Sequence, residues 1–229
     1  MTPTTELRFE ASKSAGKVSA ILDRPDEARW LLVLGHGAGA GMRHPFMGAA
    51  ASALSAKGIA TFRYQFAYME KGGGLDPQPV LLATVRSAVA AARAAAGDLK
   101  VIAGGKSMGG RMTSLAAAAM PLEGVQGLAF FGFPLHAAGQ PGTSRAEHLT
   151  RVGVPMLFLQ GTRDTLAELE LLRPIVERLP RAVMHVVDGA DHSFAMLKRS
   201  GRTNQQVLDE LASTVAEWVG RLERAGGSA

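Results

Sequence analysis

A serine flanked by glycines at the end of an apolar run constrains the fold more than any other feature. The letters Gly-Lys-Ser-Met-Gly of residues 105–109 follow the apolar residues 101–104 and open a helical pattern over residues 108–119. At a sharp strand-to-helix turn, a serine holds a strained backbone, and the residues two before and two after it must lack side chains. The turn lifts the Ser107 hydroxyl clear of the sheet and aims the first N–H groups of the helix at the atom it attacks. The stretch therefore predicts a G-x-S-x-G nucleophile elbow.

The same stretch matches the end of a phosphate-binding loop, G-x-x-x-x-G-K-[ST], which also lies between a strand and a helix. The first glycine of that motif would stand at position 100, where the chain has Lys100. The strand runs up to Gly104, which leaves no loop to hold a phosphate. Nucleotide binding through Gly105, Lys106 and Ser107 is thus the weaker alternative.

Length and cysteine content limit the architecture and the compartment. The 229 residues suit one α/β domain over residues 1–229, which would bury roughly 70% of its unfolded surface. The absence of cysteine excludes disulfides, thiolate metal sites and a cysteine nucleophile. The first residues include an acid and no apolar run, and no apolar stretch is long enough to span a membrane. We expect a cytoplasmic protein with no membrane partner.

The basic residues do not form a binding stripe. The net charge of +5 and the pI of about 9.9 would suit a polyanion. However, Arg86 and Arg93 share a helix face, and Arg221 and Arg224 lie beside acids. We therefore expect a small-molecule substrate and no nucleic-acid partner, and the oligomeric state stays open.

Apolar runs of strand length alternate with helical patterns along the chain. We expect a hairpin of strands 7–11 and 17–22, then buried strands at 30–34, 59–64, 99–103, 125–131, 154–159 and 182–187. Helices are expected at 45–57, from Asp76 as N-cap to Gly97, at 108–119 and at 166–179, with a last helix before a frayed tail at 224–229. Right-handed crossovers then predict a three-layer α/β/α sandwich with a mostly parallel, doubly wound sheet. The loop at 65–74 ends in three glycines, and segment 132–152 is too short for a lid domain.

A glycine-rich loop at residues 35–42 follows the first buried strand. Without side chains, such a loop brings backbone N–H groups close to a ligand. We expect the Ala38 N–H, with Gly39 as the near alternative, to form an oxyanion hole with the Met108 N–H. His36 is interpreted as a structural hydrogen-bonding residue.

Three polar residues each follow a strand, in the order Ser107, Asp164 and His192. Because parallel strands end at the same edge of a sheet, the three side chains should meet there. Asp188 and Asp191 are rival acids. An acid so close to the histidine in sequence would hardly reach one ring nitrogen while Ser107 uses the other, which favours Asp164.

Further residues are candidates for the substrate site: His44, Arg63, Tyr64, Lys106 and Phe133. Lys106, Arg43, His44 and Arg63 would make the cleft electropositive and favour an acyl group that bears a carboxylate. The alternative is structural: Lys106 and Arg63 pair with local groups, and Tyr64 packs the neighbouring loop.

Together these motifs resemble the α/β-hydrolase superfamily over the entire chain. Residues 35–42, 44–47, 105–111, 133–136 and 191–194 are similar to a small lidless group. That group includes bacterial predicted hydrolases, the testis-expressed hydrolase-like protein and the hydrolase-like subunit of the NSL chromatin complex, with dienelactone hydrolase as a more distant relative. The resemblance implies the fold but hardly a substrate, because this fold hosts esterases, thioesterases and non-catalytic scaffolds.

The residues themselves predict a serine hydrolase of the carboxylesterase or thioesterase kind (EC 3.1). His192 removes the Ser107 proton, Asp164 fixes the imidazole, Met108 and Ala38 hold the oxyanion, and water clears the acyl-enzyme. This chemistry needs no cofactor and no metal. A scaffold protein on the same fold is the alternative, and three intact triad residues argue against it.

Overall fold

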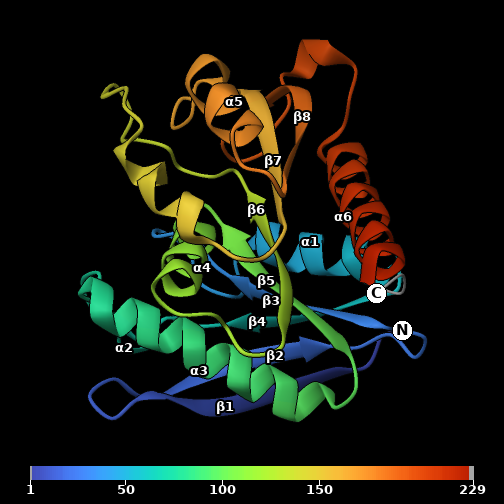
Figure 1. The fold of residues 1–229 in the computed structure, drawn as a ribbon. Coiled ribbons are helices and arrows are strands. Elements are labelled where there is room, and N and C mark those ends of the chain that lie inside the picture. Colours follow the sequence, from blue (N-terminus) through green and yellow to red (C-terminus); the bar gives the residue numbers. More distant parts are fainter. Residues whose placement is uncertain (1, 227–229) are drawn as a thin grey trace.

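A central sheet of eight strands dominates the computed structural model, which describes residues 2–226 (Figure 1). The strands are β1 (Thr4–Ser12), β2 (Gly16–Asp23), β3 (Trp30–Gly35), β4 (Ile59–Tyr64), β5 (Lys100–Lys106), β6 (Val125–Phe131), β7 (Met156–Arg163) and β8 (Ala182–Asp191). Their order across the sheet is β1-β2-β4-β3-β5-β6-β7-β8. The pairs β1–β2 and β2–β4 are antiparallel, and every later pair is parallel. The predicted hairpin and doubly wound sheet are both present.

Helices cover both faces of the sheet and make the three layers visible in Figure 1. One face carries α3 (Gln78–Ala96), α4 (Met108–Ala119) and α5 (Leu169–Glu177), and the other carries α1 (Pro45–Ser55) and α6 (Asn204–Gly226). All six residues of β3 are buried. A strand covered on both faces is largely apolar, which is why β3 reads as a continuous apolar run.

Helix α3 is long and apolar enough to cross a membrane by length and composition alone. Its Val85, Ala88 and Ala92 side chains are buried against the sheet. These contacts make α3 a core helix of the domain.

The structure departs from the sequence-based expectation at several element ends. A short helix, α2 (Ala67–Lys71), lies inside the segment expected to be a loop. Asp76 does not cap α3: its Oδ2 accepts the Tyr68 N–H at 2.8 Å, and the N-cap residue is Pro77. Helix α5 begins at Leu169 rather than at 166, because Leu166 donates its N–H to Asp164 Oδ1 in the preceding turn. Helix α6 continues to Gly226, and residues 227–229 of the expected tail lie outside the described residues.

The connection between β6 and β7 is short, and it holds one 3-10 helix, η1 (Ser144–Arg151). This segment, yellow in Figure 1, packs on α4 and contributes Ala146 and Leu149 to the core. Residues 2–226 therefore form no lid domain over the carboxyl end of the sheet.

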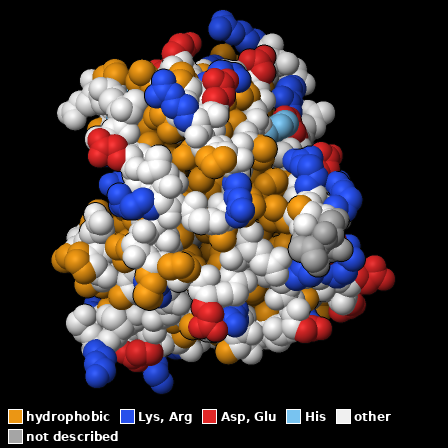
Figure 2. Space-filling model, in the orientation of Figure 1, with side chains coloured by type: hydrophobic (Ala, Val, Ile, Leu, Met, Phe, Trp, Pro, Cys, Tyr) orange, Lys and Arg blue, Asp and Glu red, His pale blue; other side chains and the backbone are white. Residues whose placement is uncertain are grey.

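Basic side chains are scattered over the face shown in Figure 2, among acidic and apolar ones. Several form ion pairs. Glu223, for example, pairs with Arg29 at 3.2 Å and with Lys100 at 3.1 Å. Arg93 pairs with Glu123 at 3.0 Å. On the face shown in Figure 2, the positive charge is thus distributed and forms no stripe.

Candidate active site

The turn from β5 to α4 places Ser107 in a strained backbone conformation. Its φ of 50° and ψ of −117° are rare for a residue with a side chain. A Cβ on Gly105 would lie 2.5 Å from the Gly35 carbonyl oxygen, and one on Gly109 would lie 2.3 Å from the same atom. Only glycine therefore lets the first turn of α4 approach β3 so closely. This is the geometry of a nucleophile elbow.

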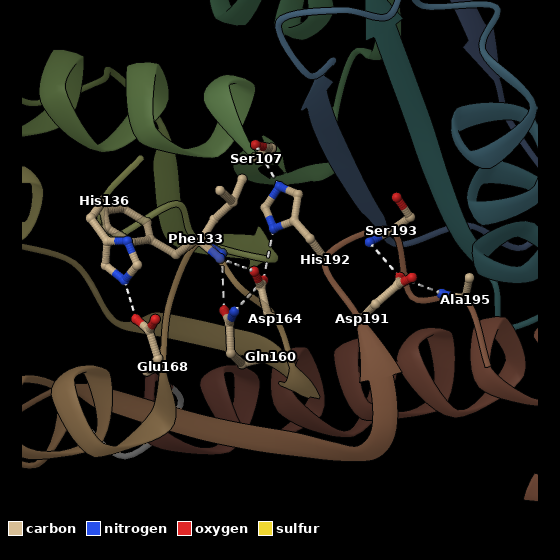
Figure 3. Close-up of polar contacts among 11 residues, drawn as sticks. Ser107, Phe133, His136, Gln160, Asp164, Glu168, Asp191, His192, Ser193 and Ala195 are labelled. Carbon is tan, nitrogen blue, oxygen red and sulfur yellow. Dashed lines mark hydrogen bonds and ion pairs between the residues drawn. The ribbon is translucent and has the colours of Figure 1, made fainter. Parts of the chain in front are cut away.

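Ser107, His192 and Asp164 form one continuous hydrogen-bonded chain (Figure 3). His192 Nε2 lies 2.8 Å from Ser107 Oγ, and His192 Nδ1 lies 2.7 Å from Asp164 Oδ2. An ionised carboxylate only accepts hydrogen bonds, so Nδ1–H donates to Asp164 and Nε2 is left to accept the serine proton. The structure brings together the three residues that the sequence selected, each after its own strand.

Asp164 is held by groups that the sequence analysis did not identify. Gln160, fully buried in β7, donates from Nε2 to Asp164 Oδ2, and its Oε1 accepts the Phe133 N–H at 3.1 Å. The other carboxylate oxygen accepts the Leu166 N–H at 2.8 Å. Gln160 therefore links the ends of β6 and β7 and fixes the acid. The sequence feature that could have identified Gln160 is its position as a polar residue directly after the apolar run of residues 154–159.

The rival acids lie elsewhere. Asp191 Oδ1 accepts the N–H groups of Ser193 and Ala195 at 2.8 and 2.9 Å, and Figure 3 shows it directed away from the imidazole. Asp188 accepts a hydrogen bond from the Thr162 hydroxyl at 3.2 Å. The geometry thus favours Asp164 as the partner of His192.

The glycine-rich loop after β3 lies beside Ser107. Within the described residues, no hydrogen bond uses the Ala38 or Gly39 N–H, and the Met108 N–H begins α4 without an intrahelical acceptor. The Ala38 carbonyl accepts the Tyr68 hydroxyl at 2.7 Å, which fixes the orientation of the loop. The two oxyanion candidates, Ala38 and Gly39, both stay open. Tyr68 therefore helps to position the loop beside Ser107.

His36 anchors the same loop through both of its ring nitrogens. Its Nδ1 lies 2.8 Å from the Gly37 carbonyl, and its Nε2 accepts the Phe66 N–H at 3.1 Å. Burial lowers the pKa of His36 to about 4, so the ring is neutral at pH 7. These contacts match the expected structural role.

A cavity of about 320 Å³ opens at Ser107 and His192. Among the substrate candidates, His44 and Lys106 line it. The remaining lining residues are Gly37, Ala38, Gly39, Ala40, Phe46, Met47, Leu166 and Ser193. The cavity is thus bounded by the glycine-rich loop, the start of α1 and the loops after β7 and β8.

Three other candidates do not reach the cavity. Arg63 pairs with Asp23 at 2.7 Å and donates to the Met42 carbonyl, so the structural alternative describes it. Tyr64 and Phe133 are buried in the core on the α3 and α4 side of the sheet. Tyr64 ends a strand and Phe133 follows one, but both side chains point into the helix layer on that side of the sheet. Arg43, also expected near the cleft, pairs with Glu6 at 2.8 Å.

Lys106 does not follow the structural alternative, because its Nζ is buried with no hydrogen-bond partner among the described residues. The ammonium lies over the rings of Phe46 and Phe194, 5.9 and 5.7 Å from their centroids. Burial lowers the pKa of Lys106 to about 8, and the Asp164 and Asp191 carboxylates oppose that effect. A buried amine therefore belongs to the same cavity as Ser107 and His192.

The Lys106 contacts also test the phosphate-loop alternative. Strand β5 runs through Lys106, so no loop precedes Ser107, and the ammonium is enclosed by two aromatic rings. This geometry argues against the nucleotide alternative. In residues 2–226, no three His, Asp or Glu side chains are grouped so as to hold a metal ion.

Comparison with known proteins agrees with this geometry. The chain is similar to dienelactone hydrolase from Anabaena variabilis (TM-score 0.73, 21% identity, covering 95% of this chain and 98% of that one). It is also similar to a lidless α/β serine hydrolase from Xanthomonas campestris (TM-score 0.73, 22% identity, 95% and 96%) and to Est1E from Butyrivibrio proteoclasticus (TM-score 0.70, 16% identity, 94% and 99%). The relation to the testis-expressed and NSL-complex proteins stays a prediction. The alpha/beta hydrolase domain family matches residues 28–220, and with the elbow and the lidless sheet described above, the chain belongs to that family.

Proposed function

We propose that the protein is a serine hydrolase that cleaves a small ester or thioester through an acyl-enzyme. The observation that carries this proposal is the unbroken chain from Ser107 to His192 to Asp164, built on a strained elbow. Membership in the alpha/beta hydrolase family supports hydrolysis in general. The roles of Ser107, His192 and Asp164 and the specificity for esters go beyond family membership and are part of this proposal.

In the acylation step, His192 Nε2 takes the proton of Ser107 as Oγ attacks the carbonyl carbon. Asp164 accepts the Nδ1–H hydrogen bond and stabilises the imidazolium that forms. The negative charge on the carbonyl oxygen lies between the Met108 N–H and the N–H of Ala38 or Gly39. The imidazolium then gives its proton to the leaving alcohol or thiol as the carbon–oxygen or carbon–sulfur bond breaks.

Deacylation repeats these roles with water. His192 accepts a proton from water, the hydroxide attacks the acyl carbon, and the proton passes to Ser107 Oγ as the ester bond to the enzyme breaks. The products are a carboxylic acid and the free serine. Tyr68 contributes indirectly, because its hydroxyl fixes the carbonyl of Ala38 in the oxyanion loop.

Two observations favour a small ester substrate. The cavity of about 320 Å³ is at the small end of ligand sites, and no lid domain extends it. Structural neighbours include proteins described as esterases from Rhodothermus marinus (TM-score 0.70) and Pyrococcus furiosus (TM-score 0.72).

The alternative is a binding or scaffold protein that kept the fold without the activity. Such a protein has no need for a strained serine, and strain of this kind persists mainly where it serves a function. The retained φ of 50° at Ser107 therefore favours the enzyme.

The test is hydrolysis of p-nitrophenyl acetate by the wild type and by Ser107→Ala and His192→Ala. We expect turnover by the wild type and loss of at least 10³-fold in both variants. Folding of each variant is checked by circular dichroism. A folded wild type without turnover, or a Ser107→Ala variant with wild-type turnover, would refute the proposal.

We further propose a cytoplasmic protein that acts on a small molecule without nucleic-acid or membrane partners. The lack of cysteine is compatible with a reducing compartment, and the basic residues on the face shown in Figure 2 are scattered and form no polyanion track there. Cell fractionation checks the compartment, and detection in a membrane pellet would contradict it.

A further inference from the structure

Two arginines near the active site lack a counter-ion. Arg111 lies in the first turn of α4, and its N–H donates to the Ser107 carbonyl at 3.1 Å. Arg145 lies at the start of η1, which packs on α4. Neither guanidinium forms an ion pair with any described residue, and the buried Arg111 Nε has no hydrogen-bond partner.

The packing of α4 on η1 places these two arginines near enough for the charge of one to act on the other. A buried hydrogen bond of 2.7 Å joins Ser114 Oγ of α4 to His148 Nε2 of η1. Arg111 and Arg145 each precede one of these residues by three positions, which is about one helical turn. The two helices run in the same direction, because the end of α4 and the end of η1 line one common cavity with Arg151. One turn back from the buried pair, Arg111 and Arg145 are therefore neighbours at the catalytic end of α4.

The charges in this cluster are not balanced locally. Burial, and then the charge of Arg145, lower the pKa of Arg111. Burial, and then the charges of Arg111 and Arg151, lower the pKa of His148 to about 4, so His148 is neutral at pH 7. The nearest acid along η1, Glu147, is exposed and forms no ion pair within residues 2–226. The positive end of the α4 dipole adds to this field.

We propose that Arg111 and Arg145 form an anion-binding subsite for a phosphate or carboxylate group of the substrate, outside the cavity at Ser107. A pair of guanidinium groups suits such a group, because each can donate two parallel hydrogen bonds to its oxygens. Neither arginine lines the catalytic cavity, so the bound group belongs to a part of the substrate that extends beyond it. The inference rests on the proposed hydrolase function and narrows it to anionic esters or thioesters.

Three substrates separate the sources of the anion: p-nitrophenyl acetate is neutral, the mono-p-nitrophenyl ester of glutaric acid carries a carboxylate on the acyl group, and acetyl-coenzyme A carries phosphates on the leaving group. Arg111→Gln and Arg145→Gln are compared with the wild type. We expect kcat/KM for one anionic substrate to fall at least ten-fold more than for the neutral ester, mainly through KM. The matched control is Arg151→Gln, at the other end of η1. It should leave the ratio of kcat/KM for the anionic substrate to kcat/KM for the neutral ester unchanged. An equal loss on all three substrates, or no loss on either anionic one, would overturn the subsite.

A direct binding measurement tests the anion subsite independently of whether the protein hydrolyses esters. Isothermal titration of inorganic pyrophosphate into Ser107→Ala should show binding that weakens with added salt and weakens at least ten-fold with Arg111→Gln added. The conservative Arg111→Lys should retain part of it. If the wild type hydrolyses no ester, the hydrolase proposal fails while this titration still decides on the subsite. Equal binding with and without Arg111 would refute it.

Discussion

Replacing Lys106 by methionine should stabilise the protein at neutral pH. The lysine ammonium is buried beside Phe46 and Phe194 without a hydrogen-bond partner in the described chain. A protonated amine is disfavoured in such surroundings, even though the two rings and two carboxylates offset part of the penalty. Methionine has a similar length, carries no charge and packs well against aromatic rings.

The magnitude follows from the lowered pKa. Burial moves the pKa of Lys106 from 10.5 to about 8. At 1.36 kcal/mol per pKa unit, this lowering means that the protonated lysine costs the folded state about 3 kcal/mol. Between pH 8 and 10.5 the unfolded chain holds this proton and the folded chain does not, so stability rises with pH there. The free-energy cost of burying the protonated lysine is present in full below pH 8 and is gone above pH 10.5.

The assay is urea unfolding, followed by tryptophan fluorescence, of the wild type and Lys106→Met at pH 7, 8, 9 and 10. We expect the variant to be more stable at pH 7 by up to about 3 kcal/mol, with a gap that shrinks as the pH rises. A control, Lys57→Met at an exposed position, should differ little from the wild type at any pH. A variant that is no more stable at pH 7, or a gap that stays constant with pH, would refute the reasoning.

Three further substitutions test separate parts of the account. Tyr68→Phe removes one hydrogen bond to the oxyanion loop, worth about 1 kcal/mol, so kcat on p-nitrophenyl acetate should fall about five-fold with KM little changed; an unchanged kcat would contradict this. Asp164→Asn should lower kcat by about 10⁴-fold. Asp191→Asn should lower kcat far less, because the Asp191 carboxylate accepts hydrogen bonds from Ser193 and Ala195 of its own loop; a larger loss in Asp191→Asn than in Asp164→Asn would reassign the acid. Arg63→Met leaves Asp23 buried without its ion pair and should lower the free energy of unfolding by about 3 kcal/mol. The kcat/KM per folded molecule should stay within two-fold of the wild-type value. A loss of kcat/KM without a loss of stability would assign Arg63 to the substrate site.

The sheet and the elbow were predictable because local rules and topology act together. Central strands are covered on both faces and are therefore largely apolar, so β3 appears as an unbroken apolar run and β6 ends in one. Parallel strands end at one edge, so residues as far apart in sequence as Ser107 and His192 could be placed together without coordinates. The strained turn at Ser107 and its flanking glycines follow from steric limits on the backbone alone.

The substrate candidates were less predictable, because a strand's end residue can face either helix layer. Arg63 of β4 pairs with Asp23 of the adjacent strand β2, and this pairing depends on the register of β2 against β4. Tyr64, the next residue, points to the opposite face and is buried. In the sequence, Lys106 resembles Arg63: each is a basic residue at the end of an apolar strand. The structure separates them, because the Lys106 ammonium lies against two aromatic rings and forms no hydrogen bond within the described residues.

Helix α2 and the role of Tyr68 escaped prediction for a similar reason. The segment around α2 ends in glycines and has too few residues for a periodic pattern. Its helix is held by tertiary contacts, such as the Tyr68 N–H bound to Asp76 and the Tyr68 hydroxyl bound to Ala38. Those contacts also took Asp76 away from the capping role that its position before Pro77 suggested.

Covalent labelling by a fluorophosphonate probe, mapped by mass spectrometry of the digested protein, tests the central claim most directly. The account predicts one phosphonate adduct, on Ser107, that is absent in Ser107→Ala and strongly reduced in His192→Ala. It also predicts that the labelling rate falls in Asp164→Asn, since His192 then loses its orienting partner. A folded wild type that takes up no probe, or takes it up on a residue other than Ser107, would contradict the claim that this elbow carries an active nucleophile.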